Sequence, residues 1–445
     1  MFKNLISQNN NFLNFILFLI PLAFIIGNFA INLLILILIL FSIFIQKKNI
    51  LMKENINFIV MFLFFFVLII FSTLIEYFNN KNYDDIDKSF FLLRYFLLIF
   101  ILNNLIEKID LKYLLISCLI FSSLLSFDII YQVIFGKDVF GFKSLGSHNS
   151  GFLGKELSAG GYIQRFLLLG IFALPIILKN KLKFNLFFLF FYSLGFIGII
   201  FSGNRMPLLL FIFFTILSII FIKKLRYEFI RGFILILLIY PILINTNNSI
   251  KQSHISFYQN IIGITKIIPI IGKKYPDLEK DKGKLFYQKY NNQLTEKEKK
   301  KYDFLRFGSG HRTLYLTAID TWQDSPLIGS GIRSFRINCK TKLHIPNRNC
   351  ESHPHNYYLD ILNTVGIIGL IVLAFILIKI VFNRHKIINN LEKKNYFIYN
   401  ALFFNMVIEF FPLRSSGSFF STSNSIFIFL LLGLLLCFNK YKSKV

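Results

Sequence analysis

The sequence predicts an all-α integral membrane protein of about twelve transmembrane helices, with one large periplasmic loop between the ninth and tenth. Of its 445 residues, 55% are apolar and only 16% are charged, and the mean hydropathy is +0.60. A soluble protein of this length would need more polar surface. The long apolar runs lack period-two alternation, which favours helices over a membrane β-barrel.

The expected spans follow from the requirement that about 20 apolar residues are needed to cross a bilayer as a helix. The first apolar run lacks a convincing small-residue cleavage site, so we expect a retained span rather than a signal peptide. The spans divide the chain into helices one to nine (1–247), the large loop (248–354) and helices ten to twelve (355–445). Their ranges are 12–27, 29–46, 56–77, 89–106, 111–135, 159–179, 184–202, 206–222, 228–247, 356–382, 396–412 and 425–439.

The Lys and Arg residues of the short loops predict the orientation. With twelve spans, six basic stretches fall on one side of the membrane: 47–48, 108–112, 179–183, 223–226, 384–394 and 440–444. The positive-inside rule places this side and both termini in the cytoplasm of a bacterial inner membrane. These loops account for much of the formal net charge of +26, and no basic motif interleaved with aromatic residues indicates nucleic-acid binding.

The large loop is too long for a plain connection, and we expect it to contain helices of its own. Residues 310–323 have the pattern of an amphipathic helix. The Lys-rich run 295–301 indicates a solvated helix face or arm, with lipid headgroup contact as the alternative, and the insert 265–305 has no assigned role. Outside the cytoplasm, Cys339 and Cys350 could form a disulfide; two free thiols are the alternative.

The most informative stretch is 351–369, at the outer end of the tenth span. Pro354 suits the first position of a helix, which would place His355 in the first turn, at the aqueous mouth. The positive end of the helix dipole favours neutral imidazole, the form required of a general base. Gly366 and Gly369 would allow close helix packing. The alternative is a polar helix cap without chemistry.

Outer-side arginines are candidates for binding phosphate. Arg205 lies where the positive-inside rule disfavours Arg, so an anionic partner held by its planar fork is natural; snorkelling is the alternative. Arg312 opens the amphipathic helix, and helix N-termini bind anions; an exposed loop Arg is the alternative. Other polar residues at this depth are candidates for lining a pocket: Glu156, Gln164, Arg165, His311, His353, Asn356 and Arg414, with Asp360 and Glu409 as weaker intramembrane acids.

The run His355-Asn356, nine residues, then Gly366-x-x-Gly369 resembles the signature of the O-antigen ligase and O-antigen polymerase family of membrane glycosyltransferases. Segments 150–161, 202–205 and 322–331 resemble other regions of that family. The resemblance implies metal-independent, inverting transfer of a glycan from undecaprenyl diphosphate to an acceptor hydroxyl. It implies that His355 acts as the base or orients the acceptor, and that Arg205 and Arg312 bind the diphosphate.

The leading hypothesis is a ligase, which uses lipid A–core as acceptor. A polymerase of the same superfamily, which extends a growing glycan, is the close alternative. A flippase or transporter of lipid-linked glycan would require inverted repeats and paired broken helices near the midplane, and the sequence shows neither. The expected partners are the lipid-linked glycan, the acceptor and membrane lipids. No metal-ligand pattern or nucleotide-binding motif is present, so no cofactor is expected.

Overall fold

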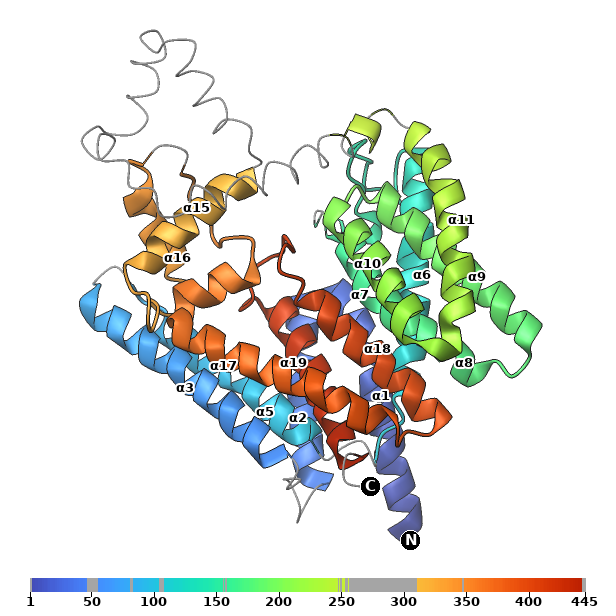
Figure 1. Ribbon diagram of the computed structural model, residues 1–445, viewed down its shortest axis with the longest axis horizontal. Helices are drawn as coiled ribbons and strands as arrows, with labels where there is room; N and C mark the ends of the chain where they lie inside the picture. Colours follow the sequence, from blue (N-terminus) through green and yellow to red (C-terminus); the bar gives the residue numbers. More distant parts are fainter. Residues whose placement is uncertain are drawn as a thin grey trace.

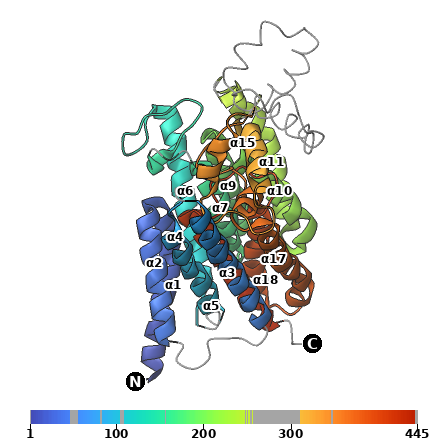
Figure 2. The ribbon, with the colours of Figure 1, turned by 90° about the vertical axis from the view of Figure 1, so that its left-hand side faces the viewer.

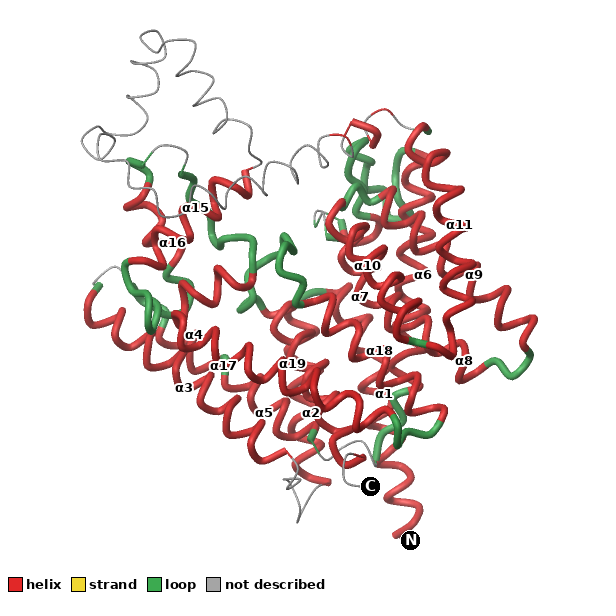
Figure 3. Tube along the Cα trace, viewed as in Figure 1, coloured by secondary structure: helices red, strands yellow, loops and turns green. Residues whose placement is uncertain are grey.

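The structure is a computed structural model that describes residues 2–45, 55–80, 83–103, 108–154, 156, 158–246, 248, 250–252, 255, 310–345 and 348–441. This part of the chain consists of helices and loops (Figure 3), with one isolated bridge between Lys137 and Lys143 and no strand. The predicted all-α class is therefore confirmed. The insert 265–305 lies outside the described residues.

The helices follow one another in the order that the apolar runs predict. Before the large loop they are α1 (Phe2–Ile26), α2 (Asn28–Ile45), α3 (Ile56–Asn79), α4 (Ile86–Phe91), α5 (Leu93–Leu102), α6 (Lys112–Phe135), η3 (Gly151–Leu153), α7 (Ala159–Gly170), η4 (Ile171–Ala173), α8 (Leu174–Ile177), α9 (Lys181–Phe201), α10 (Arg205–Phe221), η5 (Lys223–Leu225) and α11 (Arg226–Asn245). The described part of the loop contains α15 (Gly310–Gln323), α16 (Phe335–Asn338) and η8 (Cys339–Lys342). The chain then forms α17 (Tyr357–Ile388), α18 (Lys393–Glu409), α19 (Thr422–Leu436) and η9 (Cys437–Tyr441).

Eight helical segments of the described chain are long and apolar enough to cross a membrane: α2, α3, α6, α7 with α8, α9, η5 with α11, α17, and α19 with η9. Shorter apolar helices cover Asn10–Ile26 and Arg205–Phe221. The predicted span 89–106 is divided at Leu92 between α4 and α5, and the span 396–412 corresponds to α18. The membrane character is thus supported, and the count of twelve crossings stays a prediction.

Helix α19 forms the centre of the bundle and packs against α2, α5 and α18. An apolar stretch of 18 residues in α19 and η9 is 89% buried, whereas the corresponding stretch of η5 and α11 is 17% buried. Around this centre, α17 packs on α3, and α6 packs on α1, α7 and α9 (Figures 1 and 2). A helix that is apolar all round belongs in such a position.

Several of the basic loops meet at one end of the bundle. The Lys394 ammonium lies 2.9 Å from an Asp110 carboxylate oxygen, and the backbone N–H of Asp110 donates to Asn14 Oδ1 at 2.7 Å. The Asn390 amide donates to the carbonyl of Tyr441 at 2.9 Å. Helix α15 lies at the opposite end from the start of α1 (Figures 1 and 2). The grouping agrees with the predicted sidedness, and the assignment of this side to the cytoplasm stays a prediction.

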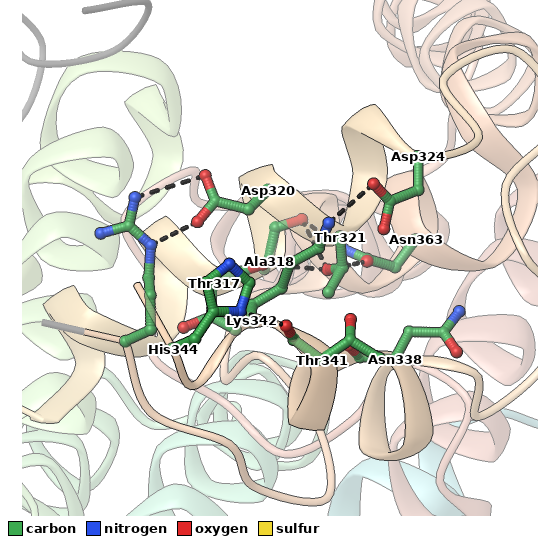
Figure 4. Close-up of polar contacts among 11 residues, drawn as sticks. Thr317, Ala318, Asp320, Thr321, Asp324, Asn338, Thr341, Lys342, His344 and Asn363 are labelled. Atoms are coloured by element: carbon green, nitrogen blue, oxygen red, sulfur yellow. Dashed lines mark hydrogen bonds and ion pairs between the residues drawn. The ribbon is translucent and has the colours of Figure 1, made fainter. Parts of the chain in front are cut away.

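We call residues 248–354 the outer segment, because the sequence predicts that they lie outside the cytoplasm. Its described part packs around α15. Leu314, Ala318, Phe335 and Cys339 form a small core, and Cys339 is joined to Cys350 by a disulfide with a Cα–Cα distance of 5.2 Å. Two ion pairs hold the disulfide-closed loop to α15 and to the turn that follows it: Asp320 with Arg348, and Asp324 with Lys342. Figure 4 shows the second pair. Thr321, on the same helix, donates to Asn363 Oδ1 of α17 at 2.5 Å.

Helix α17 is interrupted at Gly366, which has φ 63° and ψ −165°. The loop 325–331 closes the break with backbone hydrogen bonds from Ile367 and Ile368 to Pro326 and Leu327, and from Ser330 and Gly331 to Asn363 and Thr364. A Cβ atom at Gly366 would overlap the carbonyl of Leu327. The prediction that Gly366 allows close packing of another helix is therefore wrong. The glycine instead adopts a positive φ and leaves room for the backbone of the loop. At Gly369, a Cβ atom would meet the Val365 side chain of the same helix.

Candidate active site

His355 lies just before α17 rather than inside it. The helix begins at Tyr357, because the Asn356 side chain caps it by accepting hydrogen bonds from the N–H groups of Tyr358 (3.0 Å) and Leu359 (3.2 Å). The prediction that Pro354 starts the helix and His355 occupies its first turn is therefore wrong. Asn is among the best N-cap residues since its side-chain oxygen pairs otherwise unsatisfied N–H groups.

The His355 ring and backbone each have defined partners. The ring Nε2 lies 2.9 Å from Oε2 of Glu351, and the ring of His353 lies 4.2 Å away between centroids. The His355 carbonyl accepts a hydrogen bond from the N–H of Ser416 at 3.0 Å. Its φ of +56° is uncommon for a residue other than glycine and costs about 1–3 kcal/mol. Such a conformation persists only where the surroundings fix it.

Asn356 joins three elements next to His355. Its amide donates to the carbonyl of Pro412 at 2.8 Å, in the loop after α18. Its side chain also hydrogen-bonds Tyr315 of α15, and burial raises the pKa of Tyr315 to about 12. The start of α17, the outer helix α15 and the loop between α18 and α19 therefore converge at this residue.

A buried ion cluster lies beside the start of α17. Glu409 is 1% exposed and accepts hydrogen bonds from Arg165 Nε at 3.1 Å and from the Tyr357 hydroxyl at 2.8 Å. The Arg414 guanidinium lies 2.9 Å from the same carboxylate, and Arg165 also donates to Asn424 Oδ1 at 2.7 Å. Two guanidinium groups share one carboxylate, so the cluster carries a net positive charge. A buried excess of positive charge favours an anion nearby.

Arg205 lies at the start of α10, where it meets the Gly-rich segment before α7. Its neighbour Asn204 accepts a hydrogen bond from the backbone N–H of Gly160 at 2.8 Å. Burial lowers the pKa of His148, and the positive charge of Arg205 lowers it further. The segments 144–160 and 202–205 are thus brought together, as their common outer-side placement predicts.

The remaining candidates occupy different surroundings. Gln164 is 1% exposed in α7, and its Oε1 has no hydrogen-bond partner among the described residues. Glu156 is exposed just before α7 and makes no ion pair with a described residue. His311 and Arg312 belong to the first turn of α15, and their side chains lie outside the part of the chain that the structure describes.

Sequence reasoning undervalued several residues that the structure brings into the site: Glu351, Tyr357, Glu409, Asn424 and His148. A carboxylate at the end of an apolar run is a signal for a functional group, and Glu409 carries that signal. Its partner Arg165 is 244 residues away, and no spacing rule connects them. Asp360 accepts hydrogen bonds from Ser418 Oγ (2.7 Å) and the N–H of Phe419 (2.8 Å), which fastens α17 to the loop before α19.

A comparison with known protein families found a match that includes residues of this site. Residues 188–374 match the family model described as O-antigen ligase. The match begins in α9, ends in α17, and includes Arg205, α15 and the stretch from His355 to Gly369. A search of curated proteins gave no match. The family resemblance of the sequence is confirmed over this part of the chain: residues 188–374 are similar to the O-antigen ligase family.

Proposed function

We propose that this protein is an O-antigen ligase-type glycosyltransferase. It would move a glycan from undecaprenyl diphosphate to a hydroxyl of lipid A–core, at the periplasmic face of the inner membrane. The observation that carries the proposal is the family match, because it spans Arg205, α15 and His355. The gathering of polar side chains at the end of α17 that faces α15 supports it. A polymerase with the same donor and a growing glycan as acceptor is the alternative.

His355 would act as the general base. It takes the proton of the acceptor hydroxyl while the hydroxyl oxygen attacks the anomeric carbon of the donor sugar. The bond between that carbon and the phosphate oxygen breaks, and undecaprenyl diphosphate leaves with the electron pair. A single displacement of this kind inverts the anomeric configuration, as the family resemblance implies. The location of His355 before the N-cap, 25% exposed at its side chain, suits a group that must meet a substrate from water.

Arg205 and Arg312 would bind the diphosphate and stabilise the charge that develops on it. The net positive charge of the cluster around Glu409 supports the presence of an anion on this side of the bundle. Arg165 and Arg414 are both paired with Glu409. They would therefore contribute a fixed positive field to the pocket rather than a movable clamp.

Replacement of His355 tests the proposed catalytic role. We expect His355→Ala to lower the rate of transfer by about 100-fold or more, because general base catalysis contributes about 10²- to 10⁴-fold. Transfer would be measured in membranes supplied with lipid-linked glycan and core acceptor, with the protein quantified by immunoblot. His344→Ala is the matched control, since His344 is an exposed histidine of the same outer segment. Full activity of His355→Ala would remove this residue from the mechanism.

A deletion strain separates the ligase from the polymerase. Loss of a ligase leaves polymerised glycan on the lipid carrier, whereas loss of a polymerase leaves single repeats attached to core. We expect the first pattern, with activity restored by the wild-type gene and not by His355→Ala. If the deletion strain instead carries single repeats attached to core, the protein is a polymerase. Its acceptor is then the growing glycan and not lipid A–core.

A further inference from the structure

We propose that Glu351 is a positioning residue for His355. Its carboxylate would fix the imidazole in one tautomer and stabilise the imidazolium that forms during transfer. The observation behind this inference is the 2.9 Å contact between Glu351 Oε2 and His355 Nε2, across one i,i+4 spacing before α17. The inference rests on the proposed function, because it assigns Glu351 its role through the base.

The chemistry of the two groups determines the direction of the hydrogen bond. An ionised carboxylate can only accept, so the shared proton belongs to His355 Nε2. In neutral imidazole the lone pair is then on Nδ1, and Nδ1 is the atom that accepts the proton of the sugar hydroxyl. When Nδ1 is protonated, the ring becomes a cation and its attraction to Glu351 increases. A carboxylate that orients a histidine in this way accelerates proton transfer without touching the substrate.

Both partners are held by their surroundings. The carbonyl of His355 is bound by Ser416. Glu351 directly follows Cys350, which is disulfide-bonded to Cys339 in the small core around α15. Exposed ion pairs between freely moving side chains contribute little, partly because ordering them costs entropy. Here the backbones on both sides are already fixed, so less freedom remains to be lost when the pair forms.

Other ionisable groups near His355 have different partners. The ring of His353 lies beside that of His355, and its Nδ1 contacts Ser352 Oγ at 2.8 Å. Asp360 interacts electrostatically with His355, but its carboxylate is engaged by Ser418 and the backbone of the same loop. Glu351 is the described carboxylate in hydrogen-bond contact with the His355 ring. Its side chain is 44% exposed, so an acceptor can reach the site from water.

The test compares Glu351→Ala, Glu351→Gln and the control Asp324→Asn in the full-length protein in membranes. Asp324 is an exposed carboxylate of the same outer segment, paired with Lys342. We expect Glu351→Ala to lower kcat by about 10- to 100-fold with KM little changed. Glu351→Gln can still accept from Nε2 but lacks the charge, so it should lose less. Asp324→Asn should behave as wild type.

The pH profile distinguishes positioning from a structural role. A carboxylate beside the ring stabilises the imidazolium, and Glu351→Gln removes that stabilisation. The base must be unprotonated, and the acidic limb of kcat/KM should therefore move to lower pH in Glu351→Gln. Suppose that His355→Ala is inactive, while both Glu351 variants keep the wild-type kcat and the wild-type position of the acidic limb. This result would overturn the inference about Glu351 and leave the proposed function intact. If His355→Ala were active, the proposed base and this inference would both fall. If Glu351→Ala folds poorly, the position of the acidic limb of kcat/KM in Glu351→Gln tests the inference by itself.

Discussion

At the scale of single residues, Glu409 connects parts of the chain that the sequence keeps far apart. It pairs with Arg165 of α7 and Arg414 of the loop after α18, and it accepts from Tyr357 of α17. Loss of one member of a buried ion pair leaves its partners charged and unsolvated, which is much costlier than loss of an exposed pair. The carboxylate is therefore expected to be needed for assembly of the bundle as well as for the field in the site.

Glu409→Gln should destabilise the protein by about 3–5 kcal/mol, because two buried guanidinium groups lose their counter-charge. The measurement is thermal unfolding in detergent, together with abundance in membranes. Asp87→Asn is the control, since Asp87 pairs with Lys88 on the surface and its loss should change little. An unfolding temperature equal to that of wild type in Glu409→Gln would show that the cluster does not stabilise the fold.

Residue types singled out His355, Asn356, Arg165 and Arg414 individually, because polar groups at the outer ends of apolar runs are unusual. The family resemblance assigned them to one site. They did not predict where α17 begins. Pro354 is a good first helix residue, but Asn356 caps the backbone with its own side chain and moves the start to Tyr357. Which of two adequate start signals is used depends on the partners of Asn356, and those belong to distant segments.

At the scale of elements, the interruption of α17 shows why the glycine spacing had two interpretations. Small residues such as glycine on a membrane helix usually indicate close packing of another helix. At Gly366 the neighbour is instead the loop 325–331, whose backbone replaces the missing hydrogen bonds of the helix. The sequence of the loop resembles a family segment, but pairing between the two segments is a tertiary contact that neither segment specifies alone.

Gly366→Ala should disturb both the helix and the outer segment. An alanine is strained at φ 63°, by about 1–3 kcal/mol, and its Cβ would overlap the carbonyl of Leu327. We expect faster proteolysis of the outer segment and a lower transfer rate. The matched control is Gly161→Ala in α7, where a Cβ would meet nothing within 4 Å and alanine is the better helix former. Equal protease resistance of Gly366→Ala and wild type would contradict this role of the loop.

At the scale of the whole molecule, hydropathy predicted where helices lie but not how they pack. The bilayer sets the length and apolar character of a crossing helix, which is why helices occur in each expected range. Lipid is as apolar as the helices, so hydropathy does not sort inner from outer ones. Helix α19 and helix α11 are both apolar, yet one is central and the other largely exposed on the bundle.

The predicted orientation can be measured with a membrane-impermeant thiol reagent. Lys143→Cys introduces an exposed thiol in the loop between α6 and α7, and Lys181→Cys introduces one at the start of α9. We expect the first to be labelled in intact spheroplasts and the second only after lysis, because the positive-inside rule assigns Lys181 to the cytoplasm. The wild-type chain gives the background, since Cys118 and Cys437 are buried. The reverse labelling pattern would invert the topology and place His355 on the wrong side for a periplasmic reaction.

Helix α7 has a further consequence for the choice of donor. Gly160 at its start is bonded to Asn204 beside Arg205, and Arg165 five residues later is bonded to Glu409. Helix α7 therefore fixes the separation between the start of α10 and the end of α18, with a rise of about 7.5 Å over those residues. We expect this fixed distance to match the part of the donor that all donors share. The sugars that differ among donors would contact the outer segment around α15.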